Sequence, residues 1–259
     1  MKWLAKVKES LAKLFGGVSV ERLSRTVALL PLGFFVVQYT FMALVVAQPS
    51  WQPVLFGLAA CYLVAFLGVG SEWFWGRWYA KGLGWWGTLV GAGMLLQNFA
   101  PLFMIFTGMH LLVVLMLSGD KVAALYDARQ DWRQRYELDE HGAARIGKTV
   151  TRAAGSLPLL VFWALAPRQE GLAAMGSRSL GFLAIVVPLL AVTGLALHTR
   201  MRSAGVLVLA AGGCIGLACS WLFRGPADAQ AWLGVVGSGL LVAAVLPFAR
   251  PIAAFLRGR

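Results

Sequence analysis

Charged side chains are scarce in this sequence. Asp, Glu, Lys and Arg make up 13% of its 259 residues, whereas about a quarter of a soluble domain is charged. Hydrophobic residues make up 59%, and apolar runs near the roughly 20 residues that a bilayer span needs recur along the whole chain. We therefore predict an all-α protein, a polytopic bundle of membrane helices.

Residues that carry chemistry are also few. The three cysteines, Cys61, Cys214 and Cys219, lie in apolar segments at spacings that match no metal or redox motif. Three scattered histidines cannot form a histidine box, and the chain contains no HExxH, P-loop or dinucleotide-binding motif. We therefore predict no catalytic residue, no metal and no cofactor, and we favour a protein that is not an enzyme.

The centres of the apolar segments contain no Asp, Glu, Lys or Arg. A transporter coupled to protons or cations usually needs a buried carboxylate, so this absence argues against one. His110 is the one titratable residue well inside a segment, and we interpret it as a neutral histidine bonded to a neighbouring helix. The candidate intramembrane polar residues are Gln38, Thr40, Gln97, Asn98 and His110.

Eight apolar segments are expected to cross the membrane, in a layout of four and four. Their approximate bounds are residues 26–47, 51–70, 83–96, 100–118, 153–167, 180–198, 204–223 and 231–249. The fifth is the weakest, because it is short and contains Pro158; it is either a tilted span or a re-entrant segment. Glycines on the third, Gly87, Gly91 and Gly93, predict a close contact with another helix.

Two stretches outside these segments are amphipathic. Residues 1–25 place lysines on one helical face and apolar residues on the other, which is typical of a helix that lies in the membrane interface. Residues 119–156 predict a helix of about four turns capped by Asp120, a break at Gly142 and a second helix. The expected domains are an amphipathic interfacial helix at 1–25, a first membrane half at 26–118, a cytoplasmic helical connector at 119–156 and a second membrane half at 157–259.

A third stretch, residues 71–82, mixes Trp and Tyr with Glu, Arg and Lys, as the headgroup boundary of a membrane selects. It predicts an interfacial turn or short helix in which Arg77 stacks on a neighbouring Trp. The candidate residues for binding a partner or the membrane, taken from all three stretches, are Trp3, Lys6, Trp73, Trp75, Arg77, Trp78, Trp132 and Tyr136.

The positive charges set the expected orientation. With eight spans, all but three of the 23 Lys and Arg residues fall on the side of the two termini, and Arg168, Arg178 and Arg224 fall on the other. Cytoplasmic loops carry such an excess, so both termini are expected to be cytoplasmic, in the inner (plasma) membrane of a bacterium. Anionic lipids then explain the net charge of +12, and no nucleic-acid partner is expected.

Three functions remain open from the sequence. The favoured one is a non-enzymatic membrane component that binds a protein partner or lipid through its cytoplasmic amphipathic segments. The first alternative is an uncoupled transporter or flippase-like carrier of a lipid or apolar small molecule, for which the four-and-four layout and the polar residues around His110 are the support. The second is a lipid-modifying enzyme that uses His141 and nearby carboxylates such as Glu140 as acid and base.

Overall fold

Every regular element in the described part of the chain is helical. The computed structural model describes residues 2–14, 19–128, 139–167, 177–224 and 229–249. Its elements are α1 (Lys2–Leu14), α2 (Val20–Phe41), the π-helical η1 (Met42–Val46), α3 (Gln52–Gly70), α4 (Gly76–Gln97), α5 (Pro101–Met116), α6 (Asp120–Ala128), α8 (Glu140–Leu165), α9 (Ser177–Thr199), α10 (Ala204–Arg224), α11 (Ala229–Val245) and the 3-10 helix η3 (Leu246–Phe248). The prediction of an all-α protein is confirmed for these ranges.

Four helical stretches are long and apolar enough to cross a bilayer: Val20–Val46, Gln52–Gly70, Ala204–Trp221 and Gln230–Phe248. Helices α5 and α6 pass the same test only together, as a pair bent by 68°. The described residues therefore contain four candidate membrane spans, or five if the bent pair is one span. These findings do not confirm the eight spans or the four-and-four layout expected from the sequence.

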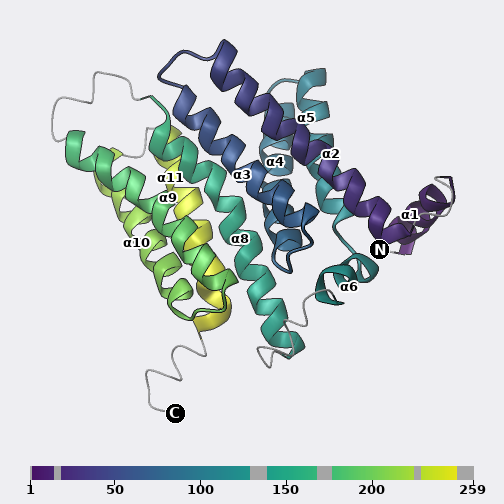
Figure 1. Cartoon of the computed structure of the whole chain (residues 1–259). Coiled ribbons are helices and arrows are strands. Elements are labelled where there is room, and N and C mark those ends of the chain that lie inside the picture. Colours follow the sequence, from purple (N-terminus) through teal and green to yellow (C-terminus); the bar gives the residue numbers. More distant parts are fainter. Residues whose placement is uncertain (1, 15–18, 129–138, 168–176, 225–228, 250–259) are drawn as a thin grey trace.

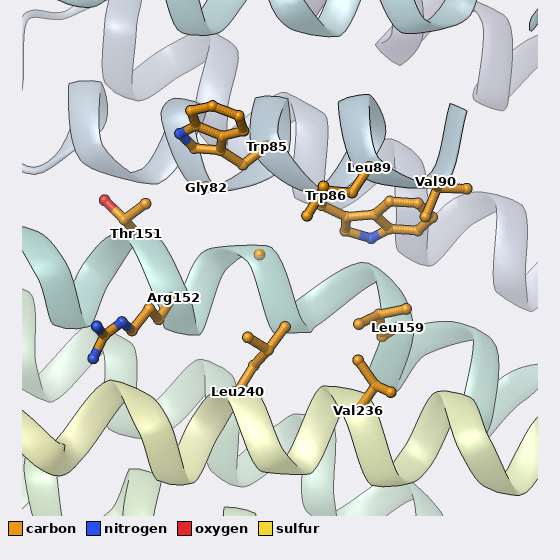
Figure 2. Close-up of a pocket in the computed structure, with 11 residues that line it drawn as sticks. Gly82, Trp85, Trp86, Leu89, Val90, Thr151, Arg152, Leu159, Val236 and Leu240 are labelled. Carbon is orange, nitrogen blue, oxygen red and sulfur yellow. The ribbon is translucent and has the colours of Figure 1, made fainter. Parts of the chain in front are cut away.

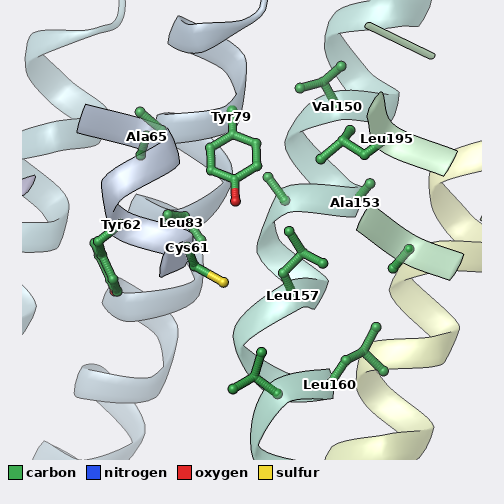
Figure 3. Close-up of a cluster of buried hydrophobic side chains, with 14 of the residues drawn as sticks. Cys61, Tyr62, Ala65, Tyr79, Leu83, Val150, Ala153, Leu157, Leu160 and Leu195 are labelled. Carbon is green, nitrogen blue, oxygen red and sulfur yellow. The ribbon is translucent and has the colours of Figure 1, made fainter. Parts of the chain in front are cut away.

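Helix α8 lies at the centre of the bundle, between α2–α5 on one side and α9–α11 on the other (Figure 1). It packs directly against α3, α4, α9 and α11. A Cβ at Gly82 of α4 would meet the backbone of Thr151, so α4 and α8 approach with their backbones nearly in contact. Figure 3 shows the apolar core that results, with Tyr79 and Leu83 on one side of α8 and Leu195 on the other.

Helix α8 is a single helix of 26 residues, which gives a length of about 39 Å from the rise per residue of an α-helix. Asp139 caps it, since its side chain accepts a hydrogen bond from the Gly142 N–H at 2.6 Å. The predicted break at Gly142 is therefore wrong, because this glycine lies in the first turn and bonds to the cap. The apolar run at residues 153–167 is the second half of this longer helix, and Pro158 lies inside it.

Two other helices begin earlier than the sequence predicts. Helix α2 begins at Val20 rather than near residue 26, because Ser19 caps it by accepting from the Arg22 N–H at 3.4 Å. Helix α4 begins at Gly76 rather than near residue 83, so only residues 71–75 form the connection that was expected to extend to residue 82. Hydropathy marks the apolar part of each helix and misses its more polar first turns.

The glycine face predicted on α4 is confirmed at two of its three positions. A Cβ at Gly87 would meet the ring of His110 on α5. A Cβ at Gly91 would meet the side chain of Thr107, also on α5. Among the residues that the structure describes, nothing lies within 4 Å of a Cβ at Gly93, so the contact predicted there is not found among them. The first two glycines allow α4 and α5 to pack closely around His110.

Candidate functional site

Helices α1 and α6 and the start of α8 lie at one end of the molecule (Figure 1), which we call the α1 end. Lys8 of α1 is buried there, and its Nζ donates to the carbonyl oxygens of Met116 at 2.9 Å and Ser118 at 2.8 Å. The last carbonyls of a helix have no partner within it, and they form the negative end of its dipole. Lys8 therefore attaches α1 to the C-terminal end of α5.

The surroundings of Lys8 change its acidity. Burial, and to a lesser extent the positive charge of Lys81, lowers the pKa of Lys8 from 10.5 to about 8. The ammonium group is therefore still mostly protonated at neutral pH, and it titrates in the mildly alkaline range. Its charge strengthens both hydrogen bonds to the α5 carbonyls, because bonds from charged donors are stronger than neutral ones.

A second contact joins α1 to α6 at the surface. The Nζ of Lys121 donates to Oε1 of Glu9 at 2.9 Å, and both side chains are exposed. The hydrogen bond and charge of Lys121 lower the pKa of Glu9. The two helices are therefore joined at the surface by this pair, and we call their exposed sides together the α1–α6 face. It includes the exposed residues Ala5, Lys6, Glu9, Lys121 and Ala124.

An ion pair joins α2 to the α3–α4 connection, and α6 packs beside it. Arg25 of α2 pairs with Glu72, which is buried and has a φ of 55°, in the left-handed region that residues other than glycine rarely adopt. Tyr126 of α6 is also buried, and its hydroxyl donates to the Val69 carbonyl at 3.4 Å. Because α6 packs against α2 and bonds to the end of α3 through Tyr126, the α6 part of the α1–α6 face has a packed support beneath it.

The predicted aromatic candidates lie at the start of α4 and just before it. The ring centroids of Trp73 and Trp75 are 5.1 Å apart, with Trp73 exposed and Trp75 partly buried. The guanidinium carbon of Arg77 lies 6.0 Å from the centroid of the Trp78 ring, which is at the outer limit of a cation–π contact and confirms the predicted stacking. A Cβ at Gly147 of α8 would meet the Trp78 ring, so this tryptophan also packs between helices.

The remaining candidates at this end are only partly described. Lys6 is exposed on α1, while the side chain of Trp3 lies outside the described part of the chain. Trp132 and Tyr136 fall in residues 129–138, which are also outside it, as is the predicted four-turn helix beyond Ala128. Their proposed part in binding stays a prediction.

The acid–base candidates of the enzyme alternative lie in an exposed helix cap. Glu140 and His141 form the first turn of α8, and His141 Nδ1 is 3.8 Å from Oδ2 of the capping residue Asp139. Within the described ranges, no group of three or more His, Cys, Asp and Glu residues could hold a metal ion. The contacts described here are those of a helix terminus.

His110 is buried in an aromatic cluster between α2, α3 and α5. Its Nδ1 lies 2.8 Å from the Phe106 carbonyl oxygen, and its Nε2 lies 2.6 Å from the Tyr62 hydroxyl. A carbonyl only accepts, so Nδ1 carries the proton and Nε2 accepts from Tyr62. The rings of Phe35 and Phe106 each lie 4.3 Å from the imidazole, centroid to centroid. These contacts agree with a neutral histidine bonded to a neighbouring helix, as interpreted from the sequence.

The four other intramembrane candidates lie elsewhere. Gln38 is exposed on α2 and donates to Met42 Sδ at 3.4 Å, and Thr40 is partly buried on the same helix. Gln97 and Asn98 are exposed at the C-terminal end of α4. Among the described residues, the hydrogen bonds of His110 go to Tyr62 and Phe106 and to none of these four. The sequence interpretation missed Tyr62, whose only signal was a tyrosine within an apolar segment.

A cavity of about 400 Å³ lies between α4, α8 and α11 (Figure 2), and we call it the α4–α8–α11 groove. Arg152 lies at one end, whereas Trp86, Leu159 and Val236 lie at the other. Arg152 is the one charged residue among those that line it. The sequence interpretation missed this groove, because it assigned Arg152 to the cytoplasmic connector.

Helical fold, candidate membrane spans and these contacts together define the class of this protein: an all-helical protein with several helices that can cross a membrane. Comparisons with protein-family models, with curated proteins and with solved structures found no match to the chain. Its function is therefore inferred from its own sequence and geometry.

Proposed function

We propose that this protein is a non-enzymatic, multi-pass component of a bacterial inner membrane that binds a protein partner through the α1–α6 face. The observation that carries the proposal is the attachment of α1 by Lys8. A helix that only binds lipid needs an apolar face and cations in the interface, and it does not need a buried lysine bonded to another helix. The attachment instead holds α1 in a defined position beside α6, which is what a protein-binding surface requires.

The membrane topology is part of this proposal, with eight spans and both termini cytoplasmic. The cations Lys6, Lys13, Arg145 and Lys148 are exposed on α1 and on the first half of α8, and cytoplasmic surfaces carry such an excess. Helices α4 and α8 fall outside the four candidate spans. Their lower hydropathy suits helices that pack against other helices through small residues instead of facing lipid.

The contacts of His110 do not favour the alternative of a carrier that binds its substrate there. Both ring nitrogens of His110 are engaged within the protein, by Tyr62 and by the Phe106 carbonyl. A substrate that bound at His110 would have to displace one of these bonds in the core.

Site-specific photo-crosslinking in the native membrane tests the proposal. A photo-reactive phenylalanine is placed at Ala5 or Ala124, both exposed on the α1–α6 face, and at Ser203 as a control, which is exposed in the α9–α10 connection. We expect one defined polypeptide to be attached from the first two positions and not from the third. Replacing Lys8 by Met should reduce its yield, because α1 is then released.

Two results contradict the proposal. The first is attachment of lipid alone from Ala5 and Ala124, which would make α1 a membrane anchor. The second is equal attachment of the same polypeptide from Ser203, which would mean a random neighbour. Native mass spectrometry of gently extracted protein then gives the number of partner chains per protein.

A further inference from the structure

We propose that the α4–α8–α11 groove binds one anionic phospholipid, with its phosphate at Arg152 and an acyl chain along the apolar walls. The groove lies between helices that form no part of the α1–α6 face. This site therefore does not rest on the proposed function, and either can fail without the other.

Arg152 has donors to offer to a phosphate. Its side chain is exposed, and its Nη1 donates to the Ala243 carbonyl oxygen at 2.6 Å. Among the described residues, no other hydrogen bond or ion pair of Arg152 is present. A guanidinium group has five N–H donors in a planar fork that fits two oxygens of a phosphate. Lys148 lies one helical turn earlier on the same exposed face of α8 and adds a second cation.

The position of Arg152 along α8 lies toward one boundary of the hydrocarbon core. It lies about 20 Å from Leu165, the last residue of α8, from the rise per residue of a helix. The hydrocarbon core of a bilayer is about 30 Å thick, so the backbone of Arg152 lies inside the core when Leu165 is at its far boundary. A long arginine side chain then extends to the nearer interface, where phosphates of that leaflet lie.

The rest of the groove fits the remainder of a lipid. Its volume of about 400 Å³ lies within the range of roughly 300–1,000 Å³ typical of small-molecule sites. Leu159, Val236 and Leu240 provide an apolar wall for an acyl chain (Figure 2). The indole Nε1 of Trp86 is buried without a hydrogen-bond partner among the described residues. An ester oxygen of the bound lipid can accept from it.

The lining has few polar groups, which argues against a peptide as the occupant of the groove. Thr151 already donates its hydroxyl hydrogen to the Trp78 carbonyl at 3.2 Å. The donors left for a ligand are those of Arg152 and the indole N–H groups of Trp85 and Trp86. A peptide segment in this groove would leave most of its backbone N–H and C=O groups without partners, at a high cost in an apolar setting. An acyl chain has no such groups.

Native mass spectrometry tests the site on the full chain. The protein is reconstituted in nanodiscs that contain phosphatidylcholine and phosphatidylglycerol in equal amounts, and the lipids retained after release are identified. We expect the wild type to retain one phosphatidylglycerol. Arg152→Gln should lower the preference for phosphatidylglycerol over phosphatidylcholine about tenfold or more, the loss expected for one charged hydrogen-bond site. Val236→Trp, which fills the groove, should remove the retained lipid.

Arg202→Gln is the matched control, since it removes the same charge from an exposed arginine in the α9–α10 connection, and it should retain lipid as the wild type does. The proposal is overturned if the wild type retains both lipids equally, or if Arg152→Gln retains phosphatidylglycerol as the wild type does. The latter result would identify an adventitious surface lipid only. If Arg152→Gln does not fold, as judged by its thermal unfolding, Trp86→Phe tests the same lipid through the buried indole N–H.

Discussion

Replacing Lys8 by Met should release α1 from the end of α5. Methionine keeps the length and apolar stem of the side chain but cannot donate to Met116 and Ser118. Two hydrogen bonds from a charged donor stabilise docking by about 1.5–3 kcal/mol each. Burial of the charge opposes part of this, as the lowering of the Lys8 pKa to about 8 indicates. We therefore expect a net loss on the order of 1–3 kcal/mol, or about 5- to 150-fold in the docking equilibrium.

Pulsed EPR spectroscopy measures this equilibrium directly. Nitroxide labels are placed at Ala5 of α1 and Ala124 of α6, both exposed, in a protein whose native cysteines are replaced by alanine. The wild type should give one narrow distance distribution. In Lys8→Met, a second, broader and longer component should appear. Lys6→Met is the control, because Lys6 is exposed on the same helix and its loss should leave the narrow distribution unchanged.

Two outcomes would refute the reasoning. A narrow distribution in Lys8→Met would mean that the two hydrogen bonds do not hold α1 in place. Equal broadening in Lys6→Met would mean that α1 is held by attraction of its lysines to anionic lipid, and not by the buried contact.

Three further predictions follow from described contacts. Because docking lowers the Lys8 pKa, undocked α1 binds more protons between pH 8 and 10.5, and the cost of docking the charge is full below pH 8. Docking should therefore become more stable as pH rises through this window, so that the narrow EPR component of the wild type persists to higher denaturant concentration, whereas Lys8→Met should show no such change. Gly87→Ala should lower the free energy of unfolding in detergent by about 1–3 kcal/mol, since its Cβ meets His110. Gly93→Ala should instead raise it by up to about 1 kcal/mol, because alanine favours a helix interior over glycine and the described residues leave room for its Cβ; equal losses in the two variants would contradict this. Tyr62→Phe leaves Nε2 of His110 without its donor and should cost about 1–3 kcal/mol in the same assay; unfolding like that of the wild type would show that the bond is dispensable.

The presence of most helices could be predicted from the sequence, but their beginnings could not. Hydropathy detects only the apolar part of a helix and not its polar first turns. The predicted starts of α2 and α4 are therefore six and seven residues too late. Gly142 was read as a break because glycine weakens a helix interior. In the structure it lies in a capped first turn, where the Asp139 carboxylate satisfies its N–H group.

The contacts of the candidate sites depend on packing that one sequence does not reveal. Lys6 and Lys8 look alike in the sequence, and only the packing of α1 on α5 decides that Lys8 is the buried one. The sequence points to His110 as a polar residue in an apolar segment, yet its partner Tyr62 lies 48 residues away and Gln97 is an equally reasonable partner from sequence alone. Arg152 was assigned to a soluble stretch because the polar first half of α8 hides its continuity with the apolar second half.

The unbroken first half of α8 has a mechanical consequence. Between its cap at Asp139 and Arg152 the helix contains no proline, and about 20 Å of continuous backbone joins the two. No loop interrupts the helix over that distance, so we expect a displacement of the exposed cap to be passed along α8 toward Arg152 and the mouth of the groove. The cap and the groove are therefore connected by one continuous helix, and a partner that bound the cap would act on the groove through it.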